Sequence, residues 1–146
     1  METQQNGKTA LITGASSGIG SELTRLFAKD GYALILVDRD ESGMSQLVYN
    51  LKNQYGTQAT LITKDLSDPN SPEEIYAQTA GTTIDVLVNN AGSGEYGQFA
   101  TETNIRRELA IIQANATSLM HLTKLYLKDM VARNEGKILM LGSEVS

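Results

Sequence analysis

A glycine-rich stretch near the N-terminus, TGASSGIG, combines residue types that can hold a phosphate group. Its glycines are Gly14, Gly18 and Gly20, and they lie between an apolar run and a segment with helical periodicity. Glycine allows a tight turn and a close backbone approach to a ligand, and the N-terminus of the next helix offers free N–H groups to an anion. Ser16 and Ser17 add hydroxyl donors. The stretch therefore predicts a pyrophosphate cradle, and the alternative is a glycine-rich turn without a ligand.

An acidic residue stands where a dinucleotide cradle needs one. Asp38 follows the second apolar run, at roughly the 20-residue separation from the glycines that suits an acid on the adenosine ribose. Its carboxylate can accept both ribose hydroxyls and would repel a 2′-phosphate, which the neighbouring Arg39 would favour. We therefore predict NAD or NADP as the cofactor, with NAD favoured because Ser17 brings no basic group into the turn. The alternative for Asp38 is a solvated acid at the end of a strand.

Five apolar runs indicate the strands that must position these residues. They occupy residues 9–13, 33–37, 59–63, 84–88 and 137–141, and none alternates polar with apolar positions. Continuous runs of this kind are typical of strands covered on both faces, as in a parallel sheet.

Helical patterns lie between the runs. One apolar stripe is formed by Ile19, Leu23, Leu26 and Phe27, and a second by Met44, Leu47, Val48, Leu51 and Tyr55. A weaker helix is expected over 70–79, and one long helix or two over 101–134. The order predicts an α/β fold in one domain over 1–146, a doubly wound parallel sheet of Rossmann type with strand order 3-2-1-4-5. The strand at 137–141 would then form an edge.

Composition excludes several classes of protein and site. The formal net charge of -5 and the scattered charges argue against nucleic acid or an anionic membrane as a partner. With no cysteine and a single histidine, His121, we expect no disulfide, no thiol catalysis and no metal site. No apolar stretch approaches the ~20 residues of a membrane span. The polar N-terminus does not resemble a signal peptide, so we expect a cytoplasmic protein.

Two motifs together resemble the short-chain dehydrogenase/reductase family. TGASSGIG and NNAG, at residues 89–92, have the order and strand positions of that family, and the resemblance extends from Lys8 to Ser146. It implies an NAD(P)-dependent oxidoreductase that moves a hydride between the nicotinamide and a small carbonyl or alcohol substrate. It also implies a homo-oligomer that assembles through the helix at 116–131, whose sequence is apolar around most of its circumference.

The resemblance assigns roles at the cofactor. KDLSD implies that Asp65 contacts the adenine amino group and that Leu66 lies near its ring. NNAG implies that Asn90 lies beside the adenosine ribose. Motif and resemblance together give an expected cofactor-binding set of Gly14, Ser16, Ser17, Gly18, Ile19, Gly20, Asp38, Arg39, Asp65, Leu66, Asn89, Asn90, Ala91 and Gly92.

The resemblance also implies catalytic residues. IQANATSL is similar to the helix that carries the family's active-site asparagine, so Asn115 is expected to bend the helix and to hold a water of a proton relay. The alternative for Asn115 is an exposed helix residue. GKILMLGSEVS is similar to the fifth strand and the loop with the catalytic serine, which indicates Ser143, with Ser146 as a second candidate.

One expected pair does not occur in the sequence. In this family a tyrosine hydroxyl supplies the proton, and a lysine four residues later lowers the pKa of that tyrosine from its usual value near 10. None of the six tyrosines has a lysine at that spacing. We expect the pair beyond Ser146, so that these residues form the cofactor-binding part of an enzyme, incomplete at the C-terminus. The alternatives are a dinucleotide-binding or interaction module without catalysis, and an unstable product without function.

Overall fold

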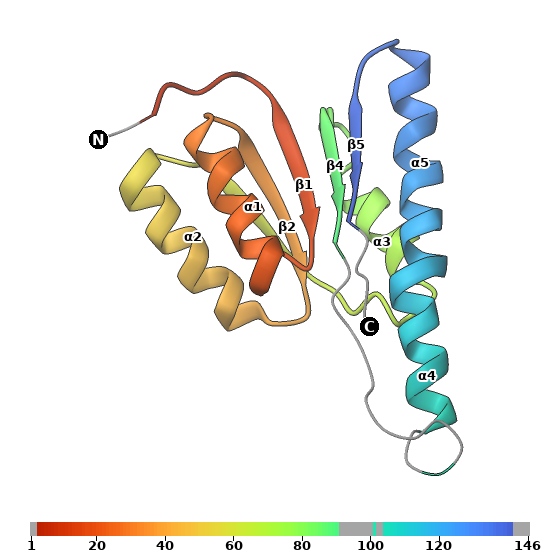
Figure 1. Ribbon diagram of the computed structural model, residues 1–146. Coiled ribbons are helices and arrows are strands. Elements are labelled where there is room, and N and C mark those ends of the chain that lie inside the picture. The colour runs from red at the N-terminus through yellow and green to blue at the C-terminus, as the bar shows by residue number, and fades with distance from the viewer. Residues whose placement is uncertain (1–2, 91–100, 102–103, 142–146) are drawn as a thin grey trace.

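The computed structural model describes residues 3–90, 101 and 104–141, in which strands and helices alternate (Figure 1). The elements in chain order are β1 (Thr9–Thr13), α1 (Gly18–Lys29), β2 (Ala33–Asp38), α2 (Glu41–Tyr55), β3 (Ala59–Thr63), α3 (Ser71–Gln78), β4 (Val86–Asn89), α4 (Ile105–Ile112), the π-helical turn η1 (Gln113–Thr117), α5 (Ser118–Ala132) and β5 (Lys137–Met140). All five predicted strands and the helix predicted over 70–79 are present.

The strands form one parallel sheet in the order β3-β2-β1-β4-β5, which confirms the predicted fold class and strand order. Helices α1 and α2 pack on one face, and α3 and α5 pack on the other (Figure 1). The direction of winding reverses between β1 and β4, because the helices that follow these two neighbouring strands pack on opposite faces of the sheet. Ligands of open α/β sheets bind at this kind of position, outside the carboxyl ends of the strands.

The core consists of two apolar layers, one on each side of the sheet. Successive residues of a strand point to opposite faces, so Ile12 packs with α1 and α2 while Leu11 packs with α3 and α5. Both side chains are fully buried. This two-sided burial explains why the central strands are apolar without alternation.

The prediction of strands covered on both faces is wrong for β5. Ile138 packs against the layer that contains α5, but Leu139, which points the other way, is 39% exposed. Met140 is 55% exposed as well. Strand β5 is an edge of the described sheet, as expected, and within the described residues no helix covers the second face at this position.

The stripe predicted for α1 is also wrong in part. Ile19 and Leu26 are 63% and 58% exposed, and the buried residues of α1 are the small ones, Gly20, Thr24 and Ala28. These three positions follow one another at intervals of four and form one face of the helix. Small side chains on that face let α1 approach β1 closely, so the large apolar residues are displaced to its flanks.

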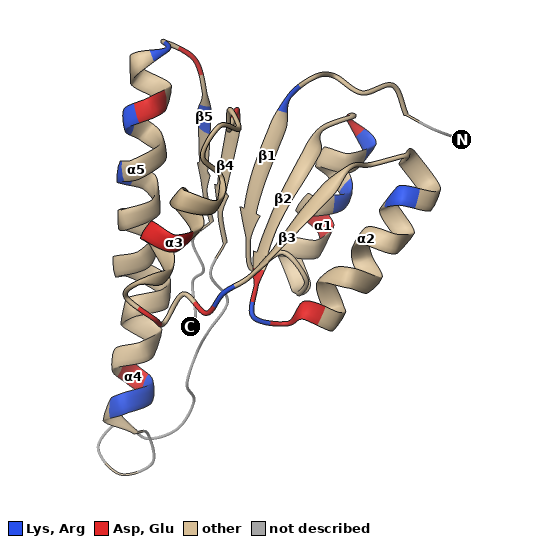
Figure 2. Cartoon of the chain, turned by 180° about the vertical axis from the view of Figure 1, so that it is seen from behind, with Lys and Arg blue, Asp and Glu red and all other residues tan. Residues whose placement is uncertain are grey.

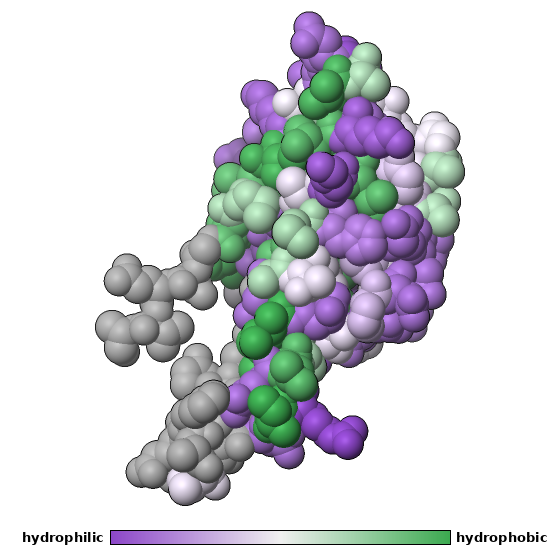
Figure 3. All heavy atoms as spheres, turned by 90° about the vertical axis from the view of Figure 1, so that its right-hand side faces the viewer, coloured by the Kyte–Doolittle hydropathy of each residue, from purple (hydrophilic) through white to green (hydrophobic). Residues whose placement is uncertain are grey.

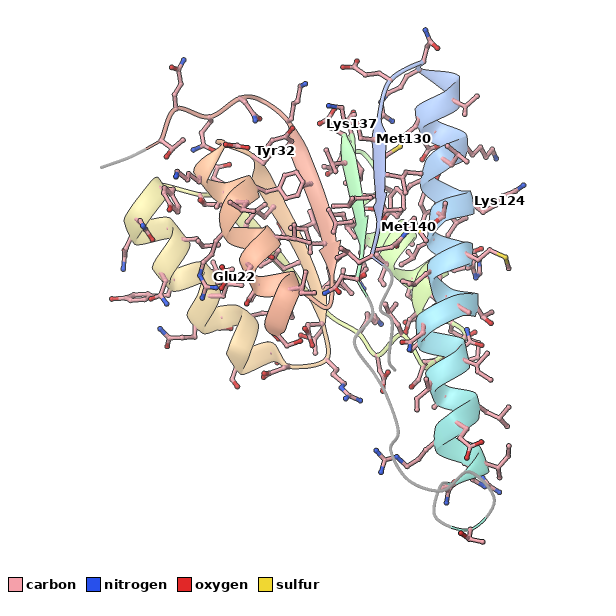
Figure 4. The ribbon with its side chains drawn as sticks, in the orientation of Figure 1. Glu22, Tyr32, Lys124, Met130, Lys137 and Met140 are labelled. Atoms are coloured by element: carbon pink, nitrogen blue, oxygen red, sulfur yellow. The ribbon has the colours of Figure 1, made fainter. Side chains whose placement is uncertain are left out.

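Helices α4 and α5 are joined through η1 into one continuous rod, whose lower end extends past the sheet (Figure 1). One face of α5 is buried through Leu119, Leu122, Tyr126 and Met130. Figure 4 shows Met130 directed from α5 toward β5, whereas Lys124 points away from the sheet. Among the described residues, no helix is both long and apolar enough to cross a membrane.

Candidate functional site

A pocket of about 510 Å³ lies at the carboxyl ends of the strands. Charged residues of both signs gather where β2 and β3 end (Figure 2). The pocket is lined by Gly14, Ser16, Ser17, Val37, Asp38, Arg39, Asp40, Lys64, Asp65, Leu66, Ser67, Asn90, Arg107, Ala110, Ile111 and Ala114. Most of the predicted cofactor residues that the structure describes therefore share one pocket.

The glycine turn is packed so tightly that no side chain fits at Gly14 or Gly20. Gly14 has a φ of +61°, and a Cβ atom there would lie 2.1 Å from the carbonyl oxygen of Asn90. A Cβ atom on Gly20 would lie 1.9 Å from the carbonyl oxygen of Gly14. Both contacts are with backbone, which cannot move aside as a flexible side chain can. Gly18, Ile19 and Gly20 shape this turn without lining the pocket.

Asn90 ties the end of β4 to the glycine turn. Its backbone N–H donates to Thr13 Oγ1 at 2.9 Å, and its side-chain Nδ2 donates to the carbonyl of Gly14 at 3.2 Å. The Thr13 hydroxyl in turn donates to the carbonyl of Val88 at 3.4 Å. Thr13 was not among the predicted site residues, although it stands first in TGASSGIG. Its role depends on a contact between two segments that are distant in the sequence, because Thr13 and Asn90 are 77 positions apart.

Asn89 lies beneath the site. Its side chain is fully buried and is not among the residues that line the pocket. Nδ2 donates to Thr123 Oγ1 at 2.7 Å, so the side chain joins β4 to α5. Ala91 and Gly92, which follow in the motif, lie outside the described residues.

The Asp38 carboxylate is held at the mouth of the pocket. One oxygen, Oδ2, accepts from the backbone N–H of Ser16 at 3.1 Å and from its hydroxyl at 2.8 Å. The other, Oδ1, accepts from the backbone N–H of Asp40 at 3.1 Å. An ionised carboxylate has about four lone-pair sites, so one remains for a ligand, and rotation of the Ser16 hydroxyl away from Oδ2 would free a second.

The loop after β3 also lines the pocket, next to the end of β2. Asp65 Oδ1 accepts from the backbone N–H of Ser67 at 2.9 Å and from its hydroxyl at 2.8 Å. The hydrogen bond from the Ser67 backbone, supported by the Ser67 hydroxyl and by the nearby Arg39 charge, lowers the pKa of Asp65. Asp65 is therefore ionised at neutral pH and can accept a further hydrogen bond.

Helix α4 and η1 supply a wall that the sequence reasoning missed. Arg107, Ala110, Ile111 and Ala114 line the pocket, and their spacing of three, four and seven residues is that of one helix face. The spacing was visible in the sequence, and Ala114 belongs to IQANATSL, but no local pattern shows that this face of the helix is turned toward the pocket. Val37, Asp40, Lys64 and Ser67 were missed as well, and they are the neighbours of predicted residues in the two strand-end loops.

Of the two predicted catalytic residues, Asn115 lies among the described residues and Ser143 does not. Asn115 lies in η1, where the helix departs from α-helical geometry, and it is exposed next to the pocket-lining Ala114. Ser143, like the second candidate Ser146, lies outside the described residues. His121 is half-buried, and its Nε2 lies 3.0 Å from Glu73 Oε1. No group of three potential metal ligands occurs among the described residues.

Comparison with known proteins gives one consistent family. The family model described as short chain dehydrogenase matches residues 8–146. Oxidoreductase UcpA of Salmonella typhimurium is 37% identical over 139 residues, which cover 94% of this chain and 52% of UcpA. The very-long-chain 3-oxoacyl-CoA reductase of Bos taurus is 32% identical over 142 residues, covering 94% and 45%. The chain thus spans about half the length of the curated relatives it matches.

Solved structures agree with the sequence relatives. The bulky-bulky ketone specific alcohol dehydrogenase from Comamonas testosteroni superposes with a TM-score of 0.88 at 32% identity, over 95% of this chain and 57% of that one. A short-chain dehydrogenase from Sphingobium yanoikuyae in complex with NADPH gives a TM-score of 0.87 at 31% identity, over 93% and 53%. Because the family model covers the chain from β1 through β5, the protein belongs to the short-chain dehydrogenase family.

Proposed function

We propose that this chain binds a nicotinamide adenine dinucleotide and is the cofactor-binding part of an oxidoreductase acting on a small carbonyl or alcohol. The observation that carries the proposal is the glycine turn packed against Asn90, which leaves no room for a side chain at Gly14 or Gly20. It opens into the same pocket as Asp38 and Asp65. When bound, the nicotinamide would supply or accept the hydride.

The residues present fit such a cofactor at its adenosine and phosphate ends. Ser17 is the N-cap of α1, and its hydroxyl makes no capping bond to the helix. Together with the N–H groups of the first turn of α1, it can donate to a pyrophosphate. Asp38 would accept the ribose hydroxyls and Asp65 the adenine amino group, with Leu66 against the ring. Asn90 would keep the glycine turn in place beneath the phosphates.

We propose NAD rather than NADP as the preferred cofactor. Ser16 and Asp40 hold the Asp38 carboxylate at the pocket mouth, where its negative charge would oppose a 2′-phosphate. Arg39 supports the alternative, because it also lines the pocket. The short-chain dehydrogenase from Sphingobium yanoikuyae has NADPH bound, so NADP is compared directly with NAD in the experiment below.

Titration with NADH and NADPH, followed by cofactor fluorescence, tests both proposals. We expect NADH to bind more tightly, and Asp38→Ala to reverse the order by weakening NADH and strengthening NADPH about tenfold each, or about 1.4 kcal/mol per effect. Ser45→Ala, at an exposed position of α2 that does not line the pocket, serves as the control and should bind as the wild type does. Tighter binding of NADPH to the wild type would overturn the NAD preference, and no binding of either at millimolar concentration would overturn the proposed cofactor site.

For the chemical step we propose that the Ser143 hydroxyl donates to the carbonyl oxygen of the substrate and that Asn115 holds a water of the proton relay. A donor aimed at the developing negative charge lowers the barrier to hydride transfer. The 146 residues contain no tyrosine with a lysine four positions later. This favours the second candidate, binding without turnover, for the chain by itself. Carbonyl-dependent oxidation of NADH by the chain alone would exclude that candidate.

We also propose that the protein forms a homo-oligomer through the outer face of α4 and α5. Apolar residues are exposed along this face, among polar ones (Figure 3): Ile105, Leu109, Ile112, Met120, Leu127 and Val131. The outer face, as we call these six residues, runs along most of the rod. Sedimentation velocity of the purified protein tests the proposal, and a monomer at micromolar concentration would contradict it.

A further inference from the structure

Two buried serines hold successive carbonyl groups of the loop after β3. The Ser71 hydroxyl, at the start of α3, donates to the carbonyl of Asp65 at 2.6 Å. The Ser118 hydroxyl, at the start of α5, donates to the carbonyl of Leu66 at 2.5 Å. The two serines are 1% and 0% exposed, so the donor end of each bond is shielded from water. The position of Asp65 and Leu66 in the pocket therefore depends on two separate helices.

Ser118 differs from Ser71 because it also closes the π-helical turn. Its backbone N–H donates to the carbonyl of Gln113, which is the i→i+5 bond that defines η1. Its hydroxyl accepts from Gln113 Nε2 at 3.0 Å. One residue thus fixes both the backbone of η1 and the carbonyl of Leu66.

The same turn contains a residue that lines the pocket and the predicted catalytic asparagine. Ala114 lines the pocket and Asn115 follows it in η1. A π-helical turn is a strained variant of the α-helix and is often found where function requires it. A hydrogen bond that holds one end of the turn can therefore influence where Asn115 lies.

We propose that Ser118 is a positioning residue that couples occupation of the pocket beside Leu66 to the conformation of η1, and hence to the placement of Asn115. The inference rests on the proposed dinucleotide site. A ligand that contacts the Asp65–Leu66 loop would limit the movement of the Leu66 carbonyl and, through the hydroxyl bonded to it, the movement of Ser118. The backbone bond from Ser118 to the Gln113 carbonyl, which closes η1, would then be held more firmly. Coupling of this kind requires a continuous chain of contacts, and here it consists of two hydrogen bonds on one side chain.

Hydrogen exchange with and without ADP-ribose tests the coupling in the intact protein, with Ser118→Ala compared with Ser71→Ala. Both variants lose one buried hydroxyl bonded to the loop, so both should bind ADP-ribose about fivefold more weakly. In the wild type we expect ADP-ribose to slow amide exchange at residues 64–67 and at 113–118. Ser71→Ala should retain the effect at 113–118, whereas Ser118→Ala should lose it.

The possible outcomes separate this inference from the proposed function. No binding of ADP-ribose to the wild type, and no slowing at residues 64–67, would reject the dinucleotide site itself. Slowing at 64–67 without any at 113–118 in the wild type would reject the coupling alone, as would slowing at 113–118 that persists in Ser118→Ala or disappears in Ser71→Ala. If Ser118→Ala does not fold, Gln113→Met removes the side-chain bond from the half-buried partner, and unchanged slowing at 113–118 in that variant would overturn the inference.

Discussion

At the scale of single residues, the site depends on positions where two backbone segments pack in direct contact. Gly14 and Gly20 are needed because the carbonyls of Asn90 and Gly14 occupy the space of their missing Cβ atoms. Asp38 and Asp65 depend on bonds from Ser16 and Ser67. The residue types were readable in the sequence, but the contact with Asn90 was not, because it joins β1 to β4.

Gly14→Ala should unfold or severely destabilise the glycine turn. The new Cβ atom would meet the Asn90 carbonyl oxygen at 2.1 Å, in addition to the backbone strain of a φ of +61°. We expect a loss of about 3 kcal/mol or more in the free energy of unfolding, together with loss of NADH binding. Urea denaturation and cofactor fluorescence measure the two effects.

Gly7→Ala is the matched control for this prediction. Gly7 has a φ of +78°, but nothing lies within 4 Å of the position of its Cβ atom. That variant should lose roughly 1 to 2 kcal/mol through backbone strain alone and should retain NADH binding. Equal losses in the two variants would show that the contact with Asn90 does not matter.

At the scale of helices and strands, sequence patterns predicted where elements lie better than how they pack. The strands were found because central parallel strands are apolar on both faces. The packing face of α1 was misread because Gly20, Thr24 and Ala28 are too small to dominate an apolar pattern. The wall at Arg107, Ala110 and Ile111 was missed because it follows from how α4 passes the pocket, which no local pattern encodes.

The contact between α3 and α5 makes stability depend on pH in the alkaline range. Tyr126 is 3% exposed, and its hydroxyl lies 2.6 Å from Thr79 Oγ1. Burial raises the pKa of Tyr126 to about 12, above the value near 10 of an unfolded tyrosine. Between about pH 10 and 12 the unfolded chain releases this proton while the folded chain keeps it. The stabilisation is therefore complete below pH 10 and is lost as pH rises toward 12.

Tyr126→Phe should flatten this pH dependence. The wild type should lose on the order of 2 kcal/mol more than the variant between pH 10 and 12, because phenylalanine has no proton to release. Urea denaturation at pH 9, 10, 11 and 12 measures the difference. Tyr49→Phe is the control, since Tyr49 is 64% exposed and its loss should leave the dependence of the wild type unchanged. Parallel curves for the wild type and Tyr126→Phe would contradict the prediction.

At the scale of the whole molecule, the helices on the two sides of the sheet differ in how their exposed apolar residues are arranged. On the side covered by α1 and α2, the large exposed apolar residues are scattered over three elements: Ile19 and Leu26 on α1, Tyr49 on α2 and Leu139 on β5. The rod of α4 and α5 has six on its outer face. Scattered apolar residues are normal on a surface, but a set aligned along one rod is typical of a protein–protein contact. The burial of the opposite side of α5 against the sheet leaves this face available.

Replacing an apolar residue at the centre of the outer face should therefore disrupt the proposed oligomer. Met120 is 68% exposed, so Met120→Lys should not affect the fold, yet it would bury an unpaired charge in the interface. We expect the sedimentation coefficient to fall to that of a monomer, with the urea midpoint of the dissociated protein at high dilution unchanged. Tyr49→Lys is the matched control, because Tyr49 is 64% exposed on α2, away from the outer face, and the same kind of change there should leave the oligomer intact. If Met120→Lys sediments as the wild type does, the outer face is not the contact, and the exposed edge of β5, with Leu139 and Met140, becomes the next surface to vary.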